Sequence, residues 1–548
     1  MFAWYICTTA HLIMISLNSR RITLTWPLSG STRLEPVRNP AGFLTACLVL
    51  LILISIGAWI FYFRQNLTLS YNDARSHLNI ARRMVDSLQP GFAQIGSVWL
   101  PLFHILELPL VSNDYLWHSG IAGSLISMVS YVLGGIYLVR ISGKLRFSTP
   151  AVIISLAVYC LNPNLIFLQT TPMTESLLLF LTIASVFYLL SWTEDLNTSS
   201  LVKAAFFTFL TTITRYDGWF LLAYMGLAVA YIGKQKKGWI FAQGNFFLFC
   251  TLAGFGIVLW LFWNRIIFGD FFYFVTGPFS AKAQQDAIMY QLGLATKFDF
   301  IYSLFVYLFT IRYNLGTWIL ILSLAGSGMF FSSGRYSRMV KVAVAALLTP
   351  FVFNVTSLFF GHSVIYLPDL PPYTWFNDRY GVMMLPAAAL AIGFLAGRKK
   401  VFAALALAVI VIQFALMYTG NNIITIEDGV RGASGEYLDD AAAWIQNHAP
   451  EGLILVAASS NDALLFRSGL PLRRFITEGV RRYWDVALAE PSAYAAYVIS
   501  HRGDIVDNHL RQNPDFLNNY RLVYQDSFSH IYRLDPGTAT PLTPKDLP

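Results

Sequence analysis

The stretch that decides the fold is residues 43–63, FLTACLVLLILISIGAWIFYF, which contains no charged residue and is long enough to cross a bilayer core of about 30 Å. Similar blocks recur along the chain, so that 56% of its residues are hydrophobic and only 12% are charged. A soluble domain rarely exceeds about 50% apolar residues and usually carries about 25% charged ones. The composition therefore predicts an all-α polytopic membrane protein.

The apolar blocks divide the chain into a series of expected membrane spans. We place these spans at about 43–63, 119–139, 148–166, 176–192, 201–214, 219–233, 245–268, 314–331, 341–360, 380–397 and 401–419. The sequence thus predicts about eleven transmembrane helices within a module of residues 43–420.

Short basic loops give the orientation. They lie at residues 140–146 (RISGKLR), 233–238 (GKQKKG), 334–341 (GRYSRMVK) and 397–400 (GRKK). With the spans above, all of them fall on one side, which we expect to be the cytoplasm. Residues 1–42, whose first eighteen residues could form an extra apolar helix, fall there too. The formal charge of +8 is accounted for by these loops, so we expect no nucleic-acid partner.

The opposite, outer side is expected to hold the long first loop, residues 64–118, and the tail, residues 421–548. Within the tail, residues 437–448 have helical apolar spacing, and residues 453–456 (LILV) are typical of a buried strand. Further strands are predicted at 496–499, 522–524 and 530–532. No glycine-rich phosphate loop follows Val456, so this small extracytoplasmic α/β domain is interpreted as a scaffold or an acceptor-docking element.

The first outer loop contains the strongest candidate for chemistry, Asp73 in residues 71–77 (YNDARSH). The spacing predicts a helix over 73–88 that lies in the membrane interface, with Asn72 as its N-cap. Asp73 would then stand at the positive end of the helix, which favours the ionised form that a general base needs. Alternatively, Asp73 only caps the helix and the nearby arginines bind lipid headgroups.

Other polar residues gather at the same predicted boundary. Glu175 begins a span after Thr174, either as a helix-capping acid or as a second acid of the site. Two Arg-Tyr pairs, in residues 214–219 (TRYDGW) and 376–380 (FNDRY), predict a shared site for an anionic headgroup, because the planar fork of arginine suits phosphate. Alternatively, residues 214–219 belong to an aromatic belt at the membrane boundary and contain an internal ion pair. These candidate phosphate-binding residues are Arg215, Tyr216, Arg379 and Tyr380. Residues that could support the acceptor or the loop are His77, Arg82, Arg83 and His104.

A divalent metal stays open at this point. Asp73, His77 and His104 could converge on such an ion, yet the sequence has no HExxH, CxxC or clustered carboxylate pattern. The four cysteines lie in apolar stretches and show no metal-ligand or disulfide spacing. No metal ligand is therefore assigned.

With these motifs, the chain resembles the GT-C class of polyprenyl-phosphate-sugar-dependent glycosyltransferases, nearest to the family-39 branch of protein O-mannosyltransferases and lipid A aminoarabinose transferases. The resemblance covers roughly residues 43–420 and depends on Asn72-Asp73, residues 172–175 (PMTE), residues 214–219 and Arg379-Tyr380. It implies a catalytic aspartate in the first outer loop, at Asp73. Protein mannosyltransferases usually have an Asp-Glu pair there, whereas Ala74 follows Asp73 in this chain.

We therefore expect a cell-membrane glycosyltransferase that moves a sugar from a polyprenyl-phosphate donor to a hydroxyl acceptor at the outer face. The reaction would invert the anomeric configuration, with Asp73 as general base. The alternative is a transporter or flippase of lipids or lipid-linked sugars, although we find no internal repeat and the polar residues avoid the membrane centre. A third interpretation is an inactive assembly scaffold whose tail binds a partner.

Overall fold

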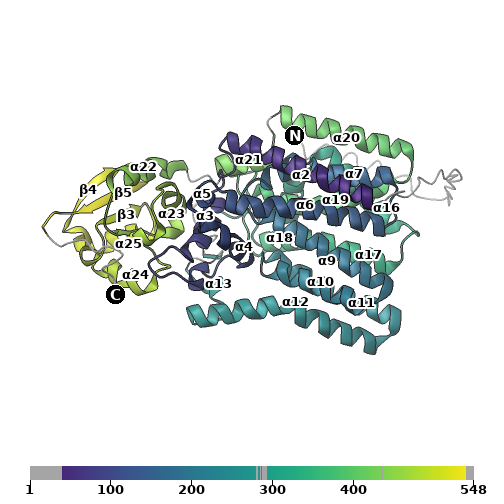
Figure 1. The fold of residues 1–548 in the computed structure, drawn as a ribbon, viewed down its shortest axis with the longest axis horizontal. Helices are drawn as coiled ribbons and strands as arrows, with labels where there is room; N and C mark the ends of the chain where they lie inside the picture. The colour runs from purple at the N-terminus through teal and green to yellow at the C-terminus, as the bar shows by residue number, and fades with distance from the viewer. Residues whose placement is uncertain are drawn as a thin grey trace. The chain divides into compact units, whose positions relative to one another are not determined.

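The computed structural model describes residues 40–537, apart from 279, 281, 284–285, 287–292, 421 and 433–435. The predicted segment 1–42, with its apolar residues 1–18, lies almost entirely outside the described residues. A bundle of long helices carries the C-terminal sheet at one end (Figure 1).

The bundle contains helices at nearly every place where a span is predicted. Its principal helices are α2 (Pro40–Arg64), α6 (Ile121–Lys144), α7 (Thr149–Cys160), α8 (Pro163–Leu168), α9 (Glu175–Asp195), α10 (Thr198–Thr212), α11 (Asp217–Lys237), α12 (Trp239–Phe268), α15 (Phe300–Leu315), α16 (Thr317–Ser332), α17 (Arg338–Ala345), α18 (Thr349–Phe359), α19 (Leu385–Ala396) and α20 (Lys400–Thr419). In the described part of the chain, seven helices are long and apolar enough to span a membrane, or eight if a bent pair counts as one span. The chain is thus a multi-pass membrane protein, and the count of eleven spans stays a prediction.

No helix is predicted between the expected spans 245–268 and 314–331, but residues 300–313 of this stretch are helical and belong to α15. Helix α15 ends where Gly316 adopts a left-handed φ of 86°, and α16 then leaves at 110° to α15. One face of α15 is buried, with Val306, Tyr307 and Ile311 in the main apolar core. This burial stabilises the helix. Its polar and aromatic residues do not form a continuous apolar block, so the sequence did not indicate a helix there.

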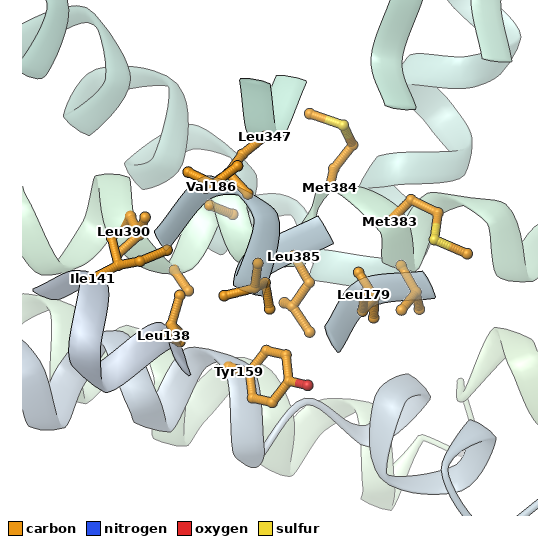
Figure 2. Packing of buried hydrophobic residues seen from close by; sticks show 14 of the residues in the cluster. Leu138, Ile141, Tyr159, Leu179, Val186, Leu347, Met383, Met384, Leu385 and Leu390 are labelled. Atoms are coloured by element: carbon orange, nitrogen blue, oxygen red, sulfur yellow. The ribbon is translucent and has the colours of Figure 1, made fainter. Parts of the chain in front are cut away.

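The core of the bundle is formed by helices far apart in the sequence. Side chains from α6, α7, α9 and α19 meet those of two short 3₁₀ turns, η2 (Ala346–Leu348) and η3 (Asp378–Met384) (Figure 2). Small residues allow close approach: a Cβ at Gly381 would collide with the Thr310 carbonyl of α15. Residues of η3, which follows the last long loop, are thereby fixed among the helices.

Residues 64–118, the predicted first outer loop, fold into short elements that lie beside the C-terminal domain (Figure 1). They are α3 (Asn72–Arg83), η1 (Phe92–Ile95), α4 (Leu102–Val111) and α5 (Asp114–His118). The predicted helix 73–88 is shorter than expected, because α3 ends at Arg83, and its position in the lipid interface stays a prediction. Residues 74–82 of α3 are all buried by protein, because α4 and the C-terminal domain pack over the helix.

The C-terminal domain confirms the predicted α/β pattern. Its sheet has the order β2-β1-β3-β5-β4, with β1 parallel to its two neighbours and β5 antiparallel to both β3 and β4. The strands are β1 (Ile454–Leu455), β2 (Phe475–Ile476), β3 (Tyr497–His501), β4 (Tyr520–Gln525) and β5 (Ser529–Leu534). Its helices are α22 (Asp439–His448), α23 (Ala458–Arg467), α24 (Arg481–Ala489) and α25 (Ile505–Gln512). The two-residue β2 is the strand that the sequence did not predict.

Candidate functional site

Asp73 lies in the first turn of α3, as predicted. The helix begins at Asn72 itself, and the preceding Tyr71 occupies the N-cap position with an extended backbone, so the prediction of Asn72 as N-cap is wrong. The side chain of Asp73 is 31% exposed, and its Oδ2 accepts a hydrogen bond of 2.6 Å from Nη2 of Arg379. The carboxylate is therefore both accessible and held by a cation.

Arg379 binds carboxylates with each nitrogen of its guanidinium. Nη2 contacts Asp73, Nε lies 3.1 Å from Oε1 of Glu175, and Nη1 lies 3.5 Å from Oδ2 of Asp428. The side chain is only 3% exposed. Buried charges are tolerated only when they are paired in this way, so Arg379 is the cation around which the acids assemble.

Arg215 is the second cation of the site and is more open, with 17% of its side chain exposed. Its Nη1 donates to Oε1 of Glu175 at 3.1 Å and to Thr174 at 3.2 Å, while Nε donates to Asp217 at 3.3 Å. The guanidinium also stacks 4.8 Å above the ring of Tyr380. One oxygen of the fully buried Glu175 therefore bridges both arginines.

The turn that presents Arg215 depends on a glycine. Helix α10 ends at Thr212 and α11 begins at Asp217, so the chain reverses within a few residues. A Cβ at Gly218 would collide with the Thr211 carbonyl, which means that the two helices can approach this closely only with glycine there.

A cavity of about 230 Å³ brings most of the predicted site residues together. Its lining includes Asp73, His77, Arg215, Tyr216, Arg379 and Tyr380. Thr174 lines it too, and the loop after α18 contributes His362, Ser363 and Val364. Glu175, Arg82, Arg83 and His104 are outside this lining. A cavity walled by a carboxylate, two arginines and tyrosines suits a phosphorylated ligand that carries hydroxyl groups.

His77, which lines the cavity, pairs with His104, which lies outside the lining. Nδ1 of His77 lies 2.9 Å from Nε2 of His104, and the His77 ring lies against Trp99, with ring centroids 4.4 Å apart. Burial, followed by the charges of Arg215 and Arg379, lowers the pKa of His77 to about 3. This imidazole is therefore neutral at physiological pH, and it can orient a ligand more readily than it can donate a proton.

Arg82 and Arg83 contact the first loop and the C-terminal domain, away from the cavity. Arg82 pairs with Asp86 at 3.0 Å and with Asp114 at 2.6 Å, and it donates to the Val111 carbonyl. Arg83 lies 3.9 Å from Asp462 in α23. Both side chains thus contact other parts of the protein and lie outside the cavity lining, and their support of an acceptor or of the loop stays a prediction.

The sequence analysis missed Asp428 and Tyr71. Asp428 lies in η4 (Asp428–Gly432), shortly after the last span, and it is fully buried beside Arg379. Tyr71 donates from its hydroxyl to Asp428 at 3.1 Å and to the Thr425 carbonyl at 2.6 Å. A signal was present, because an acid soon after the last span repeats the pattern that singled out Asp73 after the first.

A metal site is not formed by the predicted set. Among the described residues, no group of three or more His, Cys, Asp or Glu side chains is arranged to hold a metal ion. Asp73 pairs with Arg379, while His77 and His104 bond to each other. Asp73, His77 and His104 therefore do not converge on one divalent ion in this arrangement.

Comparisons with known proteins identify the fold. No protein-family model and no curated protein sequence matches the chain. The structure of ArnT from Cupriavidus metallidurans bound to undecaprenyl phosphate superposes with a TM-score of 0.55 at 12% identity, covering 92% of this chain and 100% of ArnT. The structure of the same ArnT in the apo state superposes with a TM-score of 0.52 at 13% identity, covering 91% of this chain and 99% of ArnT. The oligosaccharyltransferase of Archaeoglobus fulgidus, with Zn and sulfate, gives 0.46 at 12% identity, covering 89% and 73%. The chain has the GT-C fold, as predicted.

Proposed function

We propose that this chain is a membrane glycosyltransferase that moves a sugar from a polyprenyl-phosphate donor to a hydroxyl acceptor. The observation that carries the proposal is Asp73, a partly exposed carboxylate that shares one cavity with Arg215 and Arg379. The shared fold with ArnT, which was solved with undecaprenyl phosphate, supports the class of donor. The short basic loops support an orientation in the cell membrane with the N-terminal segment in the cytoplasm, and with the C-terminal domain and the cavity on the outer side.

In the proposed reaction, Asp73 acts as general base. It removes the proton of the acceptor hydroxyl while that oxygen forms a bond to the anomeric carbon of the donor sugar. The bond between that carbon and the phosphate oxygen breaks on the opposite face, and the electron pair leaves with the polyprenyl phosphate. A single displacement of this kind inverts the anomeric configuration.

The two arginines differ in what they can offer this reaction. Arg215 has an exposed edge in the cavity, so it can hold the departing phosphate and stabilise its developing charge, together with Tyr216 and Tyr380. Arg379 was predicted to share this task, but its nitrogens bond to three carboxylates. The geometry favours Arg379 as the group that orients Asp73. Glu175 binds both arginines through one oxygen and so fixes their positions relative to each other.

The test is transfer by purified Asp73→Asn protein in detergent, with polyprenyl-phosphate sugars as donors. General-base catalysis contributes about 10²- to 10⁴-fold, so we expect kcat to fall by that factor while the protein elutes and melts as the wild type does. Asp114→Asn is the matched control, because Asp114 also lies in the first loop and pairs with an arginine, Arg82, away from the cavity. Normal transfer by the Asp73→Asn protein would end the proposal. Substrate movement across sealed vesicles without sugar transfer would favour a transporter instead.

A further inference from the structure

Helix α3 has two environments along its length. Its first turn carries Asp73 at the cavity, whereas its later residues enter the apolar core of the C-terminal domain. Leu78, Ala81 and Met84 belong to the same buried cluster as Ile445 of α22 and Leu464 of α23. Leu78 and Ala81 of α3, and Met84 directly after it, are thus shielded by a domain that begins after the last span and whose Asp462 is 383 residues beyond Asn79.

A polar contact fixes the rotation of α3 within that core. Asn79 is fully buried, and its Nδ2 donates to the backbone carbonyl of Asp462 at 2.9 Å. The carboxylate of Asp462 also lies 3.9 Å from the guanidinium of Arg83, one turn further along α3. Because a hydrogen bond is directional and a buried amide is costly to leave unpaired, this contact specifies one register of α3 against α23.

The other end of α3 is held by the segment that links the last span to the domain. Tyr71, at the N-cap position, donates to the carbonyl of Thr425 and to the carboxylate of Asp428. Asp428 in turn contacts Arg379, which binds Asp73. The chain beyond residue 420 therefore contacts α3 both at the turn that carries the candidate base and at its middle.

We propose that the C-terminal domain positions Asp73, and that the contact of Asn79 and Arg83 with Asp462 is the clamp that sets its reach into the cavity. This role for the domain rests on the proposed transferase function and goes beyond a scaffold or acceptor-docking element. Asn79 and Asp462 are positioning residues, since neither lines the cavity.

The experiment compares Asn79→Ala with Gln94→Ala in the full-length protein. Gln94 also donates from a side-chain amide to a carbonyl of the C-terminal domain, Gly479, at 3.1 Å, but it lies in η1 and not on α3. Misplacing a catalytic group by about 1 Å can cost as much as about 10²-fold in rate, so we expect Asn79→Ala to lower kcat by about 10-fold or more. The KM of the polyprenyl-phosphate donor should stay within about twofold of the wild type, because the donor site is unchanged.

Hydrogen exchange gives a second readout that needs no activity. Amides of residues 72–83 should exchange faster in Asn79→Ala than in Gln94→Ala, because only the first variant loosens α3. If Asn79→Ala does not fold, Asp462→Lys serves instead: it turns the ion pair with Arg83 into a repulsion and leaves the cavity residues unaltered.

The outcomes separate the clamp from the proposed function. Slower turnover with unchanged donor KM and faster exchange in α3 supports the clamp. Equal kcat and equal exchange in the Asn79→Ala and Gln94→Ala proteins overturns it. If the wild-type protein transfers no sugar, the proposed function fails, and the exchange rates of α3 still decide whether the domain holds this helix.

Discussion

The two Arg-Tyr segments of the site look alike in the sequence and differ in the structure. Arg379 is almost completely buried and binds Asp73, Glu175 and Asp428. Arg215 is several times more exposed, binds Glu175 and Asp217, and lies over the ring of Tyr380 at the cavity. Burial and the number of paired acids, and not the dipeptide itself, distinguish an arginine that holds a site together from one that can receive a ligand.

The difference has a physical origin. Each carboxylate that Arg379 neutralises lowers the cost of burying its charge, but it also occupies a direction in which a phosphate would have to approach. Arg215 has fewer paired directions and keeps an edge toward the cavity. The comparison therefore predicts that loss of Arg379 disturbs folding, whereas loss of Arg215 disturbs binding.

The largest effect is expected from Arg379→Ala. Removing one partner of a buried ion pair typically costs about 3–5 kcal/mol, and here three carboxylates would lose their cation. Thermal unfolding of detergent-purified protein should show a strongly lowered midpoint or no folded protein. Arg398→Ala, at an exposed position between α19 and α20, is the control and should melt like the wild type. An Arg379→Ala protein as stable as this control would contradict the comparison.

Arg215→Ala should be better tolerated in folding and worse in donor binding. Hydrogen bonds to charged groups contribute about 1.5–3 kcal/mol, so the KM of the polyprenyl-phosphate donor should rise about 10- to 100-fold. Steady-state kinetics against donor concentration measure this effect. Arg215→Lys keeps the charge but loses the planar fork, and it should recover only part of the affinity. An unchanged donor KM in both variants would remove Arg215 from the phosphate site.

We expect His77 to lower the stability of the folded protein in acid and to leave the pH dependence of activity near neutrality unchanged. Its pKa is lowered to about 3 in the folded protein, whereas an unfolded histidine titrates near 6.5. Between these values the unfolded chain binds more protons, so stability is present above about pH 6.5 and is lost as the pH falls toward 3. Thermal melts should show a loss of about 1–2 kcal/mol between pH 7 and pH 5 from this residue.

In His77→Gln protein this part of the acid dependence should disappear, while His448→Gln, at an exposed position in α22, should keep it. Near pH 6.5, the pH dependence of activity should be the same in the wild-type and His77→Gln proteins, with no step that is due to His77. If such a step exists, the imidazole is protonated in the working enzyme, and its neutral role is wrong.

The smallest effect is expected at the ring that both arginines share. Tyr380 lies 4.8 Å from the guanidinium carbon of Arg215 and 5.2 Å from that of Arg379. A cation–π contact at a partly exposed ring contributes about 0.5–1 kcal/mol, so Tyr380→Leu should raise donor KM only a few-fold. Tyr380→Phe retains the ring and should bind donor nearly as well as the wild type. A larger loss in Tyr380→Phe would show that the hydroxyl group contacts the substrate.

Local elements were largely predictable because their patterns are local. The spans follow from the length and hydropathy of apolar blocks, and the strands of the tail follow from short buried runs. Helix α15 was not fully predicted, because its buried face carries polar and aromatic residues whose partners lie on other helices. Helix α3 was correctly predicted as a helix, but the protein partners that cover it could not be read from its own residues.

By itself, the sequence indicated the fold class of the protein, the predicted boundary at which its polar residues gather, and Asp73 as the leading candidate for the base. Only the tertiary structure decided that Glu175, Arg379 and Asp428 meet at that acid, and that Arg379 is occupied by carboxylates while Arg215 is not. The physical reason is that hydropathy acts over some twenty consecutive residues. Ion pairing, in contrast, depends on a few ångströms between residues that can be hundreds of positions apart.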